Sequence, residues 1–174
     1  MSGLSDNNKP SSIRGVKGNE IVLRNFAFTS ESGFGEGAYE GALVFDGVDD
    51  YGICTGLPIM TDYTVICRRE IINKAYYSVA SKSVVFGEGG FIFELIQDRT
   101  NYCYSFGVGN RINLYNDEIS WQTKNSYNGS TITVGNADDT DTLTLGIVRE
   151  GDASRRFLKG AIYYFALYNK SLTP

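Results

Sequence analysis

Short strand-like runs separated by turns fill this chain, and they constrain its fold more than any other feature. Each run holds β-branched or aromatic residues in alternation, and Gly, Asn or Asp separates it from the next run. No segment keeps a helical period over the length of a helix. The predicted strands are residues 20–28, 42–45, 51–54, 63–72, 76–80, 84–87, 91–96, 102–106, 111–115, 119–123, 131–134, 143–149 and 157–168. This pattern predicts an all-β sandwich or barrel.

Local patterns within the runs add detail. Along 63–72, alternate residues from Tyr63 to Ile71 share one face of a strand. In the first run the apolar positions step from odd to even near Asn25, which predicts a bulge. Two short apolar runs flank the Asp- and Gly-rich residues 46–50, which is typical of a hairpin.

The chain has 174 residues, a length that suits one domain. Residues 1–18 are polar and are predicted to be a lead-in, poorly ordered unless tethered; residues 19–174 are predicted to form a single domain. No apolar run is long enough to cross a membrane, and residues 1–19 lack the apolar region of a signal peptide. The chain therefore either stays in the cytoplasm, or leaves by lysis or as part of a larger chain.

The charge pattern argues against a nucleic-acid partner, because the net charge is −4 and the basic residues are scattered. The adjacent pairs Arg68–Arg69 and Arg155–Arg156 are expected at solvated positions. The chain has no histidine, which removes the commonest general base and the usual zinc ligand.

Three cysteines, Cys54, Cys67 and Cys103, each lie inside an apolar run and form no CxxC motif. They are expected to be buried thiols that act as small hydrophobic residues. A bridge between Cys54 and Cys67 stays open, because it depends on whether their strands are neighbours.

Two stretches show a family resemblance. Leu43–Tyr51 reads LVFDGVDDY and resembles the LxFDGxDDY element near the start of laminin G-like, concanavalin A-like lectin-glucanase jelly rolls. Phe157–Thr173 resembles their closing strand, of the form FxGxIyxxxxYNrxLT. The two motifs stand in the family's order, about one domain length apart. The resemblance covers residues 20–174 and implies an antiparallel two-sheet jelly-roll sandwich.

The resemblance also implies a context. Both faces of the closing run are apolar, so we expect it inside a sheet. In relatives the closing motif leads into a further tail, whereas this chain stops at Pro174, so we expect a module cut from a longer chain. Residues 121–129 resemble modules of bacterial surface proteins and bacteriophage-encoded structural proteins, which implies a location on an extracellular surface or a virion.

No catalytic residues are predicted. Glycosidases of this superfold carry an ExDxxE set on one strand, which is missing here. The nearest candidates, Glu94 and Asp98, would lie about 13 Å apart on an extended strand. Retaining enzymes need ~5 Å and inverting enzymes ~6.5–9.5 Å between the carboxyl groups. The glycine clusters at 33–37 and 87–90 lack the strand-to-helix context of a nucleotide fingerprint and are interpreted as turns.

Clustered carboxylates suggest a calcium site, formed by Asp46, Asp49 and Asp50. A second such cluster is Asp138, Asp139 and Asp141. The alternative is that these side chains cap turns by accepting backbone N–H groups. No other cofactor is predicted.

Surface aromatic and amide side chains are the candidates for ligand binding, since aromatic faces pack against sugar C–H groups and amides bind hydroxyls. The predicted contacts are Trp121, Tyr127, Asn128, Asn110, Asn113, Tyr102 and Tyr104, with Asn116 nearby. A lone tryptophan is also common at the edge of a core, and Tyr102 and Tyr104 share a strand face on which they would either stack on a ligand or pack.

Together these patterns predict a non-catalytic, lectin-like carbohydrate-binding or adhesion module of a larger protein. The alternative is a structural or assembly module of a phage virion or surface protein, which makes protein–protein contacts. A glycoside hydrolase is a minor alternative. The expected partners are a glycan or neighbouring protein subunits, with neither nucleic-acid binding nor membrane insertion.

Overall fold

The computed structural model describes residues 11–72, 77–85, 88–97, 100–113, 119–148 and 157–173. One short 3-10 turn, η2 (Gly37–Tyr39), accompanies the strands in this part of the chain. The strands are β1 (Ser12–Arg14), β2 (Glu20–Arg24), β3 (Gly33–Phe34), β4 (Leu43–Asp46), β5 (Tyr51–Cys54), β6 (Thr64–Ile71), β7 (Tyr77–Val85), β8 (Glu88–Gln97), β9 (Thr100–Ser105), β10 (Val108–Arg111), β11 (Ile119–Thr123), β12 (Ser126–Tyr127), β13 (Ser130–Thr131), β14 (Leu143–Leu145) and β15 (Lys159–Tyr168).

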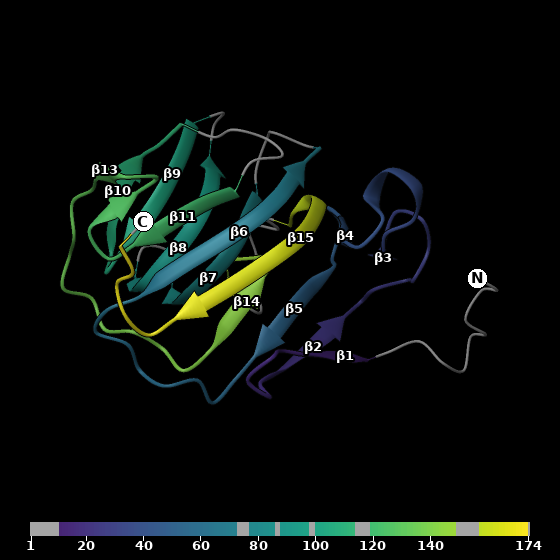
Figure 1. The fold of residues 1–174 in the computed structure, drawn as a ribbon, viewed down its shortest axis with the longest axis horizontal. Coiled ribbons are helices and arrows are strands. Elements are labelled where there is room, and N and C mark those ends of the chain that lie inside the picture. Colours follow the sequence, from purple (N-terminus) through teal and green to yellow (C-terminus); the bar gives the residue numbers. More distant parts are fainter. Residues whose placement is uncertain are drawn as a thin grey trace.

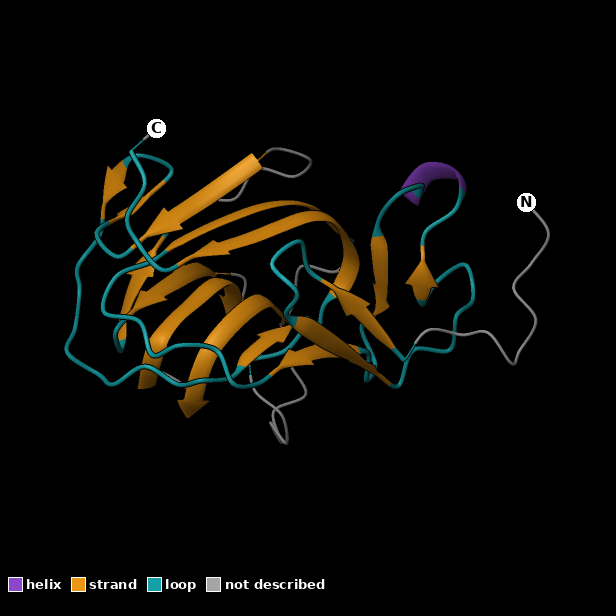
Figure 2. Ribbon diagram, turned by 60° about the horizontal axis from the view of Figure 1, so that its bottom comes forward, coloured by secondary structure: helices purple, strands orange, loops and turns teal. Residues whose placement is uncertain are grey.

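The strands form two antiparallel sheets that pack face to face (Figure 1; Figure 2). The eight-stranded sheet has the order β1-β2-β5-β14-β7-β8-β9-β10. The seven-stranded sheet has the order β13-β12-β11-β6-β15-β4-β3. The predicted fold class, an all-β antiparallel two-sheet sandwich, is confirmed.

Alternation along the strands fills the space between the sheets. On β6, Val65, Cys67 and Ile71 point inward and are at most 3% exposed, as the sequence predicted. From the opposite sheet, Phe91 and Phe93 of β8 join the same apolar cluster. The core is therefore shared by the two sheets, as in other sandwiches.

The predicted hairpin at residues 46–50 is wrong. β4 pairs with β15 and β3, whereas β5 pairs with β2 and β14, so the chain changes sheets at this turn. The sequence signal is the same in both cases, because two short apolar runs flank a tight turn whether the strands pair or cross between layers. The side chain of Asp50 closes the turn by accepting the backbone N–H of Asp46.

The first strands also differ in detail from the prediction. Ser12–Arg14 lies in the expected lead-in but forms β1 and pairs with β2, and Ile13 packs against the core. One apolar side chain therefore tethers this part of the segment to the sandwich. The change from odd to even apolar positions near Asn25 falls at the end of β2, where Asn25 takes a left-handed φ of 66°.

The closing strand β15 lies between β6 and β4, inside its sheet as expected. A register shift between Ile162 and Tyr164 divides it. Before the shift Ile162 faces the core, and after it Phe165 and Leu167 do. β4 pairs only with Lys159–Ile162, so the second half of β15 is paired on its β6 side alone among the described residues.

Candidate functional site

The outward face of the seven-stranded sheet carries an array of large side chains on three adjacent strands. In register, Trp121 of β11 lies opposite Ile66 of β6, which lies opposite Ala166 of β15. One step along, Ile119 lies opposite Arg68, and Arg68 opposite Tyr164. Directly opposed residues of an antiparallel sheet point to the same face. We name these six residues the outer platform.

The outer platform is open to solvent. Ile119 is 58% exposed and Tyr164 49%, while Trp121, Ile66 and Ala166 are half-buried. Tyr168, which follows on the same face of β15, is 39% exposed. Exposed apolar side chains that are contiguous, rather than scattered, mark interaction sites.

A tight turn fixes Trp121 in place. The side-chain Oδ1 of Asn128 accepts the Trp121 N–H at 2.8 Å, and the Trp121 carbonyl accepts the Asn128 N–H at 2.9 Å. Asn128 has a φ of 45°, and Gly129 beside it lets the turn lie close to the indole. Asn128 is thus a positioning residue for Trp121.

Polar groups lie within the outer platform and at one end of it. The Arg68 guanidinium lies 5.0 Å from the centre of the Tyr163 ring. At one end, the C-terminal segment crosses the face: Thr64 Oγ1 donates to the Lys170 carbonyl and accepts the Leu172 N–H, each at 2.8 Å. The face is therefore bounded at this end rather than continuous with the whole sheet.

Tyr127 and Asn110, which the sequence suggested as ligand contacts, have structural partners. Tyr127 is 4% exposed, and its hydroxyl donates to Glu94 Oε1 at 2.5 Å inside the sandwich. Asn110 bonds Thr133 through both ends of its amide, which fastens β10 to the segment beside it. Neither side chain is placed to meet a ligand on the outer platform.

The other suggested residues lie elsewhere. Tyr102 and Tyr104 pack on Ile92, Leu95 and Val148, on the outward face of the eight-stranded sheet, with ring centres 6.4 Å apart. This matches the packing alternative. Asn113 is exposed beyond the end of β10, and Asn116 lies outside the described residues. Of the suggested set, the structure brings together only Trp121 and Asn128 on this face.

Arg69 is buried, so the expectation that it is solvated is wrong. Its Nε and Nη2 donate to Glu94 Oε2 at 2.5 Å and Oε1 at 2.8 Å, and both side chains are fully buried. The pair joins β6 of one sheet to β8 of the other. Burial raises the pKa of Glu94, and the charge of Arg69 opposes that rise. The proposed partner carboxylate, Asp98, lies outside the described residues.

A second buried ion pair ties loops to the sandwich. Lys82 Nζ lies 2.9 Å from Asp139 Oδ2 and donates to the Pro58 carbonyl at 3.0 Å. The Met60 N–H donates to the same carboxylate at 2.7 Å. Asp139 therefore has a structural role, which removes the central member of the suggested cluster at 138–141.

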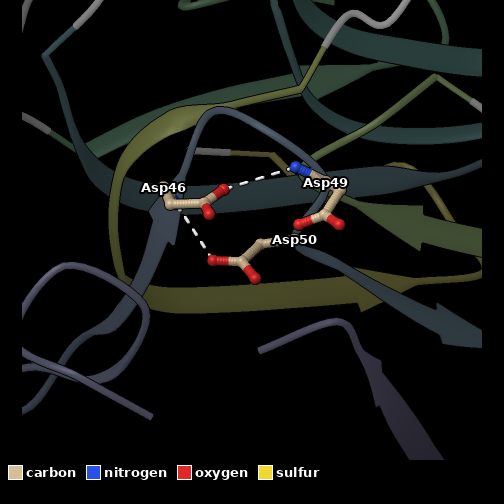
Figure 3. Close-up of side chains that lie close together, drawn as sticks. All are labelled: Asp46, Asp49 and Asp50. Atoms are coloured by element: carbon tan, nitrogen blue, oxygen red, sulfur yellow. Dashed lines mark hydrogen bonds between the residues drawn. The ribbon is translucent and has the colours of Figure 1, made fainter. Parts of the chain in front are cut away.

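Asp46, Asp49 and Asp50 lie together, with ligand oxygens within 4.8 Å of one another (Figure 3). Asp46 Oδ1 accepts the Val48 N–H at 2.7 Å, and Asp50 Oδ2 accepts the Asp46 N–H at 3.0 Å. These are the bonds of a capped turn. Calcium needs six to eight oxygens, of which these three carboxylates would supply only a part, so the calcium site stays a prediction.

The sequence missed Ile66, Arg68, Ile119, Tyr164 and Tyr168 as parts of a face. The available signal was the closing strand, which is apolar on both faces. Since only one face of that strand lines the core, its other face had to carry Tyr164 and Tyr168 outward. Their neighbours depend on strand order, which the sequence does not reveal.

No protein-family model matches the sequence, and the search of curated proteins found no match.

Cys54, Cys67 and Cys103 are all buried free thiols, as expected. The described residues include no helix with the length and apolar character needed to cross a bilayer.

Proposed function

We propose that the chain is a non-catalytic recognition module that binds carbohydrate over the outer platform. The observation that carries the proposal is the joint presentation of Trp121 and Tyr164 on one sheet face, with Tyr164 49% exposed. Aromatic rings held by a rigid sheet offer flat apolar area at little entropic cost. The two-motif resemblance to lectin-like jelly rolls points the same way.

Polar groups for sugar hydroxyls stand beside these rings. Arg68 lies between Ile119 and Tyr164 in register, and the tyrosines carry hydroxyl groups at their tips. A face with rings on the two outer strands and a cationic donor on the strand between them suits a ligand with both C–H and hydroxyl surfaces.

The position of Glu94 supports the non-catalytic part of the proposal. This carboxylate is fully buried between the sheets and bound by Arg69 and Tyr127. A glycosidase acid or nucleophile has to reach the scissile bond from a cleft.

One observation favours a second candidate, an assembly surface for a neighbouring subunit. Ile119 is 58% exposed on β11, on the same face as Trp121 and directly opposite Arg68 of β6. Buried aromatic and Arg anchors surrounded by apolar contacts are typical of protein interfaces.

A glycan array separates the two candidates. We expect the wild-type domain to bind glycans, with and without chelator, and Trp121→Ala to weaken binding about tenfold, or roughly 1.4 kcal/mol. Tyr102→Ala is the matched control, because Tyr102 lies on the opposite sheet. Full binding by Trp121→Ala would overturn the assignment of the site. Absence of glycan binding, together with self-association that Ile119→Lys abolishes, would establish the assembly surface instead.

A further inference from the structure

The second half of β15 has an open side. β6 pairs with β15 as far as Tyr168, whereas β4 pairs only with Lys159–Ile162. Beyond Ile162 no described strand of the same layer flanks β15 on the β4 side (Figure 1). Alternate residues of a strand direct their N–H and C=O groups to opposite sides. Residues 164–168 therefore present backbone donors and acceptors to this open side, which we name the β15 flank.

Core-facing side chains next to the flank are incompletely covered. Phe165 and Leu167 point into the apolar cluster but are only half-buried. Their register partners on β6, Cys67 and Val65, are both 0% exposed. Cys67 and Val65 are covered by β15, which lies beside them in the sheet. Phe165 and Leu167 are more exposed because no described strand lies beside this half of β15 in the same way.

An apolar pocket of about 350 Å³ opens at the point where β4 begins, beside Ile162 of β15. Apolar side chains from both sheets line it, among them Ile13, Ile21, Phe34, Leu43, Leu145 and Phe165. Arg14 is the only charged residue of the described lining. The pocket thus has room for one large apolar side chain and a cation for a neighbouring carboxylate.

We propose that the β15 flank binds an extended peptide segment of another protein, which adds a strand to the seven-stranded sheet. The free backbone edge selects an extended chain, the pocket takes an apolar side chain, and Arg14 takes an acidic residue next to it. Strand addition of this kind gains affinity from main-chain hydrogen bonds and specificity from side-chain pockets.

This site differs from the outer platform, although the two share Tyr164, which stands on the platform and also lines the pocket; Trp121, on β11, does not line the pocket. The outer platform uses side chains on the outward face of β11, β6 and β15, whereas the flank uses the backbone edge of β15 and the interior pocket. Loss of glycan binding in Trp121→Ala and loss of peptide binding at the flank are therefore independent results.

The probe is a capped synthetic peptide of about seven residues, which spans the ~13 Å of residues 164–168. Valine and threonine alternate along it, and the last residue is aspartate. Two further versions carry backbone N-methyl groups on the odd or on the even residues. We expect one N-methylated version to bind like the parent and the other to lose binding, because only one peptide edge faces β15. Equal binding by all versions, or loss in both, would overturn the proposal.

Hydrogen exchange locates the peptide. We expect slower exchange of amides in 164–168 when the parent peptide is bound. Arg14→Glu is expected to weaken the aspartate peptide about two- to fivefold and to favour a lysine-ended peptide. Arg111→Glu, on β10 at the far end of the other sheet, should change the binding of neither the aspartate peptide nor the lysine-ended peptide. Unchanged exchange at 164–168, no peptide binding up to millimolar concentration, or protection that arises from self-association alone would each refute the proposal.

Discussion

Asp50 is fully buried in the turn between β4 and β5, and burial raises its pKa from the ordinary 3.8 to about 6. The neighbouring carboxylates of Asp46 and Asp49 add to this rise. The folded chain therefore binds this proton more tightly than the unfolded chain does. The contribution of Asp50 to the free energy of unfolding grows as pH falls from 7 towards 4, and is lost as pH rises through about 6.

Asp50→Asn should remove this dependence while keeping an oxygen for the Asp46 N–H. We expect the stability of the wild type relative to Asp50→Asn to increase by up to about 3 kcal/mol between pH 7 and pH 4. Urea unfolding at a series of pH values measures the difference. The control is Glu36→Gln, which removes an exposed carboxylate and should show the same pH dependence of stability as the wild type. If the stabilities of the wild type and Asp50→Asn changed in parallel with pH, Asp50 would not be the cause of the dependence.

The burial of individual side chains was predictable where it depends on the alternation of the strand alone. Alternation places Val65 and Cys67 inside, and it would place Arg69 there as well. Arg69 was instead expected in solvent, because the carboxylate that neutralises it, Glu94, stands on a strand of the other sheet. Tyr127 was misjudged as a surface residue for the same reason. A partner distant in sequence decides whether a polar side chain is buried.

At the scale of elements, most strands were predictable and their pairing was not. The apolar runs mark β6, β8, β11 and β15 close to their observed bounds, but β4 and β5 were expected to pair with each other. Strand order and the register shift in β15 are set by contacts between distant segments. The outer platform and the β15 flank both depend on strand order, and for that reason they could not be predicted from the sequence.

The Arg69–Glu94 pair joins two elements, β6 and β8, across the core. Removing one partner leaves a buried charge unpaired, so we expect Arg69→Met to cost about 3–5 kcal/mol of unfolding free energy. Adding Glu94→Gln removes that charge and keeps an acceptor for the Tyr127 hydroxyl. The double variant should therefore be more stable than Arg69→Met by at least about 1 kcal/mol.

Arg68→Met is the matched control for this cycle, because Arg68 is exposed and contacts the Tyr163 ring at the surface. It should cost less than about 1 kcal/mol. Denaturant unfolding of these three variants and the wild type gives the comparison. A double variant as unstable as Arg69→Met would show that the charge of Glu94 is not what destabilises the single variant.

At the scale of the whole molecule, the two sheets are held together by one apolar core and by polar bonds that cross it. The Arg69–Glu94 pair spans the sheets, and so does the bond from Tyr63 to Ser105, at 3.0 Å. Gln122 of the seven-stranded sheet also donates to the Tyr104 carbonyl of the other sheet at 2.8 Å. Among the described residues, the other apolar clusters are much smaller than the core that the two sheets share, so we expect both sheets to unfold in one cooperative step.

The single tryptophan makes this expectation testable, because Trp121 reports only on the seven-stranded sheet. Far-ultraviolet circular dichroism reports on the strands of both sheets. We expect the two signals to follow one transition in urea, with the same midpoint and slope. A tryptophan transition at lower urea than the dichroism transition would show that the seven-stranded sheet opens first. In Arg69→Met, where one crossing bond is lost, the shared midpoint should move to lower urea while the two signals stay together, because the apolar core still joins the sheets.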